Sequence, residues 1–298
     1  MAPDRAAGYA RAPRRTPDAA RPRGRIGAGR TDGEDMGFVD FLYAAPVWQM
    51  GCIVSAIAIG GTTFSMFLID RLWPKERRRL HNDIAGFLIA VVGIVYAILI
   101  SSLAITVLAR KDRAENLVYE EADRLAALER EVVVLPQDVR PAIRAEIGAY
   151  LDAVIDREWP QMHRAERPDA GEGALAALWR AVAALPMTNL AEMTGAQELR
   201  RHIDRLYEMR RGRSDLATSG VDPVVWTVVL LGSVATVVFA VMFGVENFVA
   251  HLFMSCLLAF SIALAMTMIV ALDWPYYGPD SVPSQPLIDL RANLDWHS

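Results

Sequence analysis

The sequence predicts an all-α integral membrane protein with four transmembrane helices and a helical domain inserted between spans two and three. Of its 298 residues 53% are hydrophobic, yet 22% are charged, and the charges are confined to segments that separate long uncharged runs. Four runs reach about 20 apolar residues, the length that crosses ~30 Å of hydrocarbon. The segment between the second and third runs alternates between apolar and charged residues at helical spacing, which is typical of water-exposed helices.

The four apolar runs define the expected transmembrane helices. They extend over residues 47–69, 84–109, 223–243 and 248–272. Buried helices of a soluble protein are the alternative, but soluble chains rarely contain four uncharged runs of this length. Small residues recur along the first two runs at near-heptad spacing, which allows close helix packing in lipid. This pattern fits tight packing within one bundle, and it also fits a second helix that faces a symmetry axis and leaves room for a conduit.

Residues 110–222 are expected to form a helical soluble domain. Neither Gly nor Pro occurs between residues 110 and 135, so the first helix of this domain is expected to continue the second span out of the bilayer until Pro136. Further helices are expected over 138–158, 174–185 and 190–219, between breaks rich in Pro and Gly. The first helix has apolar residues at spacings of three or four, which predicts one buried face: Val118, Ala122, Leu125, Leu128 and Val132.

The two ends of the chain have compositions unlike the rest. Residues 1–35 contain eight Arg among Ala, Pro, Gly and Asp, with no apolar run, which predicts a disordered Arg-rich tail. Residues 274–298 are rich in Pro and are expected to form a loosely attached C-terminal tail. The expected organisation is therefore a tail (1–35), two transmembrane helices (36–109), the helical domain (110–222), two further transmembrane helices (223–273) and the C-terminal tail (274–298).

The sequence contains no motif that predicts catalysis, a cofactor or a metal site. Phosphate-binding loops, paired zinc-ligand motifs and nucleophile elbows are all absent, so we expect a protein that is not an enzyme. The net charge of −4 with dispersed basic residues does not indicate nucleic acid as a partner. Cys52 and Cys256 both lie in apolar runs and predict no disulfide. No ionisable residue lies in the middle of any span, which argues against an ion-coupled transporter and is compatible with a passive pore.

Basic residues flank both ends of the second span. Arg77, Arg78 and Arg79 precede it, and Arg110 and Lys111 follow it. In a ring of identical subunits they would form two collars of positive potential that attract anions. Anchoring of the helix ends to lipid headgroups is the alternative, and the sequence alone favours it. Basic residues lie on both sides of the membrane, and their larger total on the side of the inserted domain predicts that this domain is cytoplasmic.

Several segments resemble the bacterial bestrophin-like membrane protein family. The resemblance rests on HNDIAGF (81–87) and VGIVYA (92–97) in the second span, together with EEA (120–122), EWP (158–160), PVVW (223–226) and LDWP (272–275), and it covers about residues 36–279. It implies four inner-membrane spans with a cytosolic helical domain. Through more distant similarity to true bestrophins, it also implies a pentameric chloride or anion channel. The acidic calcium clasp of true bestrophins is represented here only by scattered Asp, so calcium gating is not expected.

The resemblance implies that the second span lines the pore. The close-approach or polar candidates are Gly86, Gly93 and Ser101, and the constriction candidates are Phe87, Ile94 and Tyr96. The expected partners are membrane lipid, inorganic anions and identical subunits. The alternative from another functional class is a membrane-anchored interaction or stress-signalling module, in which the helical domain binds a partner and nothing crosses the bilayer.

Overall fold

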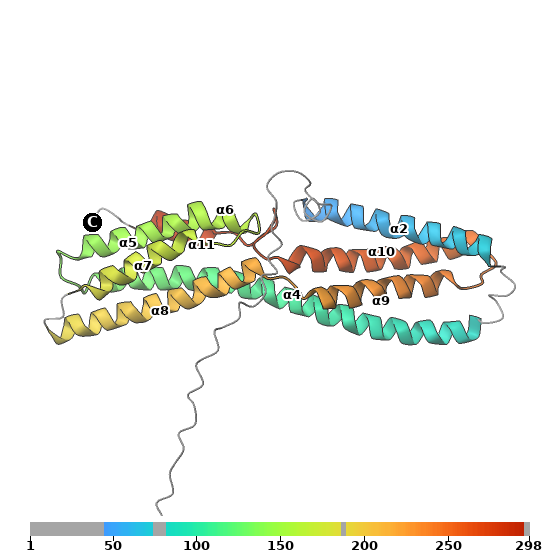
Figure 1. The fold of residues 1–298 in the computed structure, drawn as a ribbon, viewed down its shortest axis with the longest axis horizontal. Helices are drawn as coiled ribbons and strands as arrows, with labels where there is room; N and C mark the ends of the chain where they lie inside the picture. Colours follow the sequence, from blue (N-terminus) through green and yellow to red (C-terminus); the bar gives the residue numbers. More distant parts are fainter. Residues whose placement is uncertain (1–44, 74–81, 186–188, 295–298) are drawn as a thin grey trace, which may run out of the picture. The chain divides into compact units, whose positions relative to one another are not determined.

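The computed structural model describes residues 45–73, 82–185 and 189–294, and these contain helices but no strand. The Arg-rich segment 1–35 lies outside the described residues. In chain order the helices are α2 (Val47–Leu72), α4 (Asn82–Val132), α5 (Arg140–Asp152), the π-helical segment η1 (Ala153–Glu158), α6 (Trp159–Met162), α7 (Ala170–Ala183), α8 (Leu190–Thr218), α9 (Pro223–Val241), α10 (Phe248–Asp273) and α11 (Gln285–Asn293) (Figure 1).

Four helices are long and apolar enough to cross a membrane, namely α2, the first part of α4, α9 and α10. This result confirms the all-α fold with four candidate spans. The helix α10 packs against the other three, and α2 also contacts α9; Figure 1 shows α2, α9 and α10 beside the first part of α4. An apolar cluster forms where α4, α9 and α10 meet, from Tyr96, Leu103, Val107, Val229, Met266 and Ile269.

Polar side chains fix where the last two spans begin. Asp222 accepts a hydrogen bond from the N–H of Val224, and Pro223 occupies the first turn of α9. Asn247 accepts from the N–H of Val249 at the start of α10. The first N–H groups of a helix have no acceptor within the helix, so these two side chains define the helix starts.

The helix α4 leaves the apolar bundle without a break and runs through the helical domain, as expected from the absence of Gly and Pro. The apolar face predicted for this part is confirmed, since each of its five residues is buried. The helix α8 packs along it, and α5 and α11 also contact α4; Figure 1 shows α8 beside the second part of α4. The domain core includes Ile143 and Ile147 of α5, Leu175 and Leu178 of α7, and Leu199, Ile203 and Leu206 of α8.

The prediction that the second helix of the domain ends before Pro160 is wrong. The chain continues through η1 and α6 to Met162. In η1 the N–H of Trp159 donates to the carbonyl of Val154, five residues back, which shifts the hydrogen-bond register by one residue. Pro160 then stands in the first turn of α6, directly after this shift in register.

The prediction of a loosely attached C-terminal segment is also wrong. Tyr276, Val282 and Leu287 are buried in the core of the helical domain. The hydroxyl of Tyr276 donates to the carbonyl of Ala114 on α4 at 2.9 Å. The segment after α10 therefore returns to the domain and covers part of its core.

Candidate functional site

The apolar part of α4 has one face buried within the chain and another face exposed. Phe87, Ile94, Ile98 and Ile105 are 71%, 63%, 63% and 69% exposed, and Ser101 is exposed between them. Successive members are three, four or seven residues apart, which places them on one side of the helix. We call these five residues the α4 row. The row carries no charge and one hydroxyl group.

Tyr96 lies on a different face of α4 from this row. It is 6% exposed, and its hydroxyl lies 2.5 Å from that of Ser233 on α9. A Cβ atom at Gly232 would lie 2.7 Å from the Tyr96 ring, so α9 approaches α4 this closely only because residue 232 has no side chain. The structure therefore separates Tyr96 from Phe87 and Ile94, the other two constriction candidates.

The two candidate glycines lie beside the α4 row. Gly86 and Gly93 are both half-buried. A Cβ atom at Gly86 would meet the ring of Phe243 at 4.0 Å, and one at Gly93 would meet nothing within 4 Å among the described residues. Packing against the described residues therefore requires neither glycine.

The predicted basic collars are only partly within the described residues. Arg77, Arg78 and Arg79 lie outside them. Arg110 donates a hydrogen bond to the backbone carbonyl at the C-terminal end of α8, so it contacts the helical domain. Lys111 lines a groove between α2 and α10. The structure thus brings neither Arg110 nor Lys111 into contact with the α4 row.

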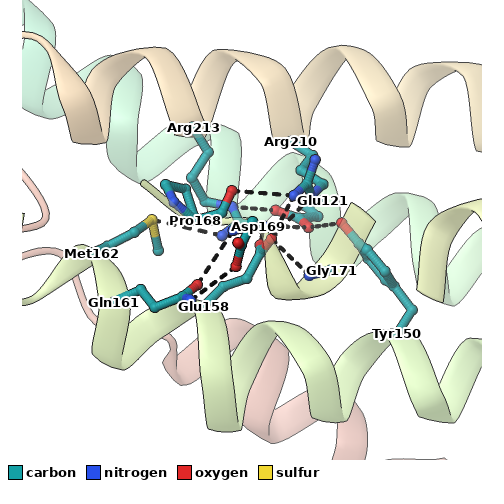
Figure 2. Close-up of polar contacts among 10 residues, drawn as sticks. All are labelled: Glu121, Tyr150, Glu158, Gln161, Met162, Pro168, Asp169, Gly171, Arg210 and Arg213. Atoms are coloured by element: carbon teal, nitrogen blue, oxygen red, sulfur yellow. Dashed lines mark hydrogen bonds and ion pairs between the residues drawn. The ribbon is translucent and has the colours of Figure 1, made fainter. Parts of the chain in front are cut away.

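A buried charge cluster lies in the helical domain between α4, η1 and α8 (Figure 2). Arg213 makes a two-point contact with Glu121, with Nε–Oε2 and Nη2–Oε1 distances of 3.0 and 3.2 Å, and its Nη2 also lies 3.0 Å from Oε2 of Glu158. Arg210 donates to Oε1 of Glu158 at 2.7 and 3.1 Å. The hydroxyl of Tyr150 donates to Glu121 at 2.5 Å. These five residues, with two carboxylates and two guanidinium groups, form the charge cluster.

Burial and neighbouring charges shift the pKa values of Glu158, Arg213 and Tyr150. Burial alone raises the pKa of Glu158, but Arg213 and Arg210 outweigh it, so this pKa is lowered overall. Burial alone lowers the pKa of Arg213, but the surrounding carboxylates raise it overall. Burial raises the pKa of Tyr150 well above its usual value, and the charge of Glu121 adds to this effect. Glu158 is therefore ionised and Tyr150 neutral at neutral pH. The charge cluster joins α4, α5, η1 and α8 through buried hydrogen bonds and ion pairs.

Aromatic and backbone groups complete the surroundings of the charge cluster. The guanidinium carbon of Arg213 lies 5.4 Å from the centre of the Trp159 ring, within the range of a cation–π contact. The N–H of Gly171 donates to Glu158 at 2.8 Å, and a Cβ atom at residue 171 would lie 2.9 Å from that carboxylate oxygen. Sequence reasoning did not predict the charge cluster. The available signal was Glu121, a carboxylate at helical spacing within the apolar face of α4.

A third buried carboxylate joins the apolar bundle to the link between α8 and α9. Asp273, the last residue of α10, is 2% exposed. It accepts hydrogen bonds from the N–H of Val221 at 2.6 Å and from the indole N–H of Trp226 at 3.3 Å. This contact fixes the end of the fourth span against the start of the third.

The buried carboxylates and the α4 row lie in contrasting environments. The buried carboxylates are held by guanidinium, hydroxyl or N–H donors, which is the environment of structural groups. The α4 row instead offers an exposed apolar surface with one hydroxyl, the kind of surface that forms hydrophobic constrictions in channels.

Comparisons with known proteins agree with this fold. The Bestrophin-like domain family matches residues 56–287. Two structures of variants of a bacterial bestrophin homologue from Klebsiella pneumoniae share the fold. The first has 15% identity and a TM-score of 0.61, and the match covers 86% of this chain and 97% of that chain. The second has 14% identity and a TM-score of 0.63, and the match covers 84% of this chain and 99% of that chain. A structure described as a membrane protein has 15% identity and a TM-score of 0.58 and covers 86% and 99%.

No curated protein matches this chain, and identities this low in solved structures establish the fold alone. The family match is broader evidence, because it runs from α2 to α11 and covers most of the sequence. The chain therefore belongs to the bestrophin-like family.

Proposed function

We propose that this chain assembles into a ring of identical subunits that passively conducts chloride-like inorganic anions across the inner membrane. The resemblance to bestrophins supports a pentamer. The observation that carries the proposal is the α4 row, which remains exposed while the opposite face of the same helix is packed against α9 and α10. In a ring, this face of α4 borders the axis and becomes the wall of a pore.

The members of the α4 row have different roles in this proposal. Phe87, Ile94 and Ile98 form an apolar constriction, in which conduction depends on pore width and wetting. Ser101 supplies a hydroxyl that can donate a hydrogen bond to an anion. Gly86 and Gly93 flank the constriction and allow close approach of neighbouring copies of α4.

Anion preference comes from charge at the two ends of the apolar part of α4. Arg77, Arg78 and Arg79 precede the span, and Arg110 and Lys111 follow it. A positive group within a Debye length of about 8 Å raises the local anion concentration without touching the ion path. The surplus of basic residues on the side of the helical domain supports a cytoplasmic location for that domain.

Cysteine accessibility tests the role of the α4 row. Cys52 and Cys256 are first replaced by Ser, and Ser101→Cys is then introduced. In planar bilayers a negatively charged methanethiosulfonate reagent is expected to reduce the anion current of Ser101→Cys. The matched control is Leu103→Cys, whose position is 5% exposed within the chain and is expected to be insensitive.

Two results would contradict the proposal. One is equal sensitivity of the variants at positions 101 and 103, because the α4 row would then have no special access to water. The other is a monomer in detergent together with vesicles that pass no anions, which would favour the membrane-anchored interaction module.

A further inference from the structure

We infer that the groove between α2 and α10 binds one membrane phospholipid with a zwitterionic aminophosphate headgroup. The groove has a volume of about 860 Å³ and is lined by apolar residues of both helices together with Lys111 and Asp280. No step of this inference depends on ion conduction.

The walls of the groove suit an acyl chain. On α2 they are formed by small residues that include Gly51, Cys52 and Ala56, and on α10 by larger ones that include Leu264 and Met268. Both helices are long and apolar enough to cross a membrane, so the hollow between them lies at the level of the hydrocarbon. Filling it with a lipid tail restores the dispersion contacts that its lining otherwise lacks.

The mouth of the groove lies at the level of lipid headgroups. Val47 and Trp48, the first two residues of α2, line this end. Trp48 is 68% exposed, and exposed Trp at the end of a span is typical of the membrane–water interface. A lipid whose tail occupies the groove therefore places its headgroup beside this end.

The mouth of the groove contains two opposite charges. Asp280 accepts a hydrogen bond from the N–H of Val47 at 3.2 Å, which holds its carboxylate at the start of α2. Lys111 forms no ion pair or hydrogen bond with any other residue that the structure describes. A phosphate would pair with the ammonium of Lys111, and a headgroup amine would pair with the carboxylate of Asp280.

The charge pair selects among phospholipids. Phosphatidylethanolamine provides both a phosphate and a primary ammonium. Phosphatidylglycerol can pair with Lys111 through its phosphate, but its neutral glycerol headgroup offers no cation to Asp280. Phosphatidylcholine has no N–H with which to donate to the carboxylate.

Native mass spectrometry of the full-length protein in mild detergent tests the inference. The protein is titrated with phosphatidylethanolamine, phosphatidylglycerol and phosphatidylcholine bearing identical acyl chains. We expect one phosphatidylethanolamine per chain, bound about fivefold more tightly than either competitor, as one interfacial charge contact allows.

Two variants probe the two charges separately. Lys111→Gln is expected to weaken binding of all three lipids, because each carries the phosphate, and Asp280→Asn is expected to abolish the preference for phosphatidylethanolamine. Asp280→Asn keeps an oxygen that can accept from Val47, so the start of α2 is preserved. The matched controls are Arg113→Gln and Asp112→Asn, exposed charges at the same level of α4 that do not line the groove.

Three outcomes would overturn the inference. One is equal retention of the three lipids by the wild-type protein. Another is unchanged lipid binding in Lys111→Gln together with an unchanged preference in Asp280→Asn. The last is dissociation of an oligomer by these two variants with no change in bound lipid, as seen by light scattering, because the groove would then be covered by a second copy of the chain.

Discussion

Arg213 and Glu121 form a two-point salt bridge that is wholly enclosed by the helical domain, with side chains 1% and 0% exposed. The pair joins α8 to α4 across 92 residues of sequence. A buried ion pair gains little net free energy over apolar packing, because desolvation offsets the attraction between the charges. Its strong effect appears when one partner is removed, since the remaining charge stays buried without compensation.

The first prediction follows from this asymmetry. Arg213→Met leaves the carboxylates of Glu121 and Glu158 without their shared guanidinium, and we expect the domain to lose about 3–5 kcal/mol of unfolding free energy. Thermal unfolding in detergent, followed by size-exclusion chromatography of the heated protein, measures the loss. Arg205→Met is the matched control. Its ion pair with Glu208 is 60% and 63% exposed, so its effect should remain within about 0.5 kcal/mol. Equal losses of unfolding free energy in both variants would show that the buried ion pair contributes no more to stability than the exposed one.

The charge cluster also predicts an acid limit to stability. The pKa of Glu158 is lowered from its ordinary value of 4.5 when the protein folds. At acidic pH the unfolded chain therefore binds more protons at this position than the folded chain does. The contribution of Glu158 is fully present above the ordinary pKa and is lost as the pH falls through the folded pKa.

The measurement is the unfolding temperature at a series of pH values from about 6 to 3. We expect the wild-type curve to fall on the acid side, and the curve of Glu158→Gln to be flatter there. Glu208→Gln removes an exposed carboxylate and should leave the curve close to that of the wild type. If the unfolding temperature of Glu158→Gln fell with pH as steeply as that of the wild type, the acid sensitivity would come from other groups.

The sequence predicted the elements of this fold better than their orientations. The four spans and the apolar face of α4 beyond residue 110 follow from length and local spacing, which need only neighbouring residues. The apolar part of α4 is different, because it is apolar on all sides and its periodicity cannot identify the face that packs. Periodicity therefore does not separate Tyr96, which contacts α9, from the exposed Phe87 and Ile94.

Local sequence patterns do not predict the charge cluster or the burial of the C-terminal segment, for another reason. Glu121, Glu158 and Arg213 come from three separate helical segments, and no spacing rule connects them. Tyr276, Val282 and Leu287 are spaced irregularly in a Pro-rich segment that lacks helical or strand periodicity over most of its length. Only the tertiary arrangement reveals that both sets are buried.

The close contact between α4 and α9 gives a prediction about packing. Gly232→Ala places a methyl group against the Tyr96 ring, so we expect a loss of about 1–3 kcal/mol from overpacking. In a Tyr96→Ala background the same change should cost less, because the ring has been removed. A double-mutant cycle based on thermal unfolding in detergent measures this coupling, which we expect to be about 1 kcal/mol. Additive effects would show that the two residues do not share this space.

The C-terminal segment provides a test of its role in the domain core. Leu287→Ala removes a fully buried side chain of α11 and should cost about 2–5 kcal/mol. Arg291→Ala is the control on the same helix. Arg291 pairs with Asp152 and Asp156 at 3.1 Å, but both carboxylates are more than half exposed, so its loss should matter little. Limited proteolysis should accordingly release the C-terminal segment of Leu287→Ala faster than that of Arg291→Ala. Equal rates would indicate that burial of Leu287 does not hold the segment.

The proposed anion preference predicts a change of selectivity when charge is reversed before the second span. Replacing Arg77, Arg78 and Arg79 together by Glu turns the local potential negative, and we expect the anion-to-cation permeability ratio to fall by about tenfold, the lower end of such focusing effects. Reversal potentials in bilayers with a chloride gradient measure this ratio. The shift should shrink at 1 M salt, where the Debye length is about 3 Å. The control reverses three exposed charges of α8, Arg201, Arg205 and Arg211. An unchanged ratio in the first variant, or the same shift in both, would contradict a role for these residues at the mouth of the pore.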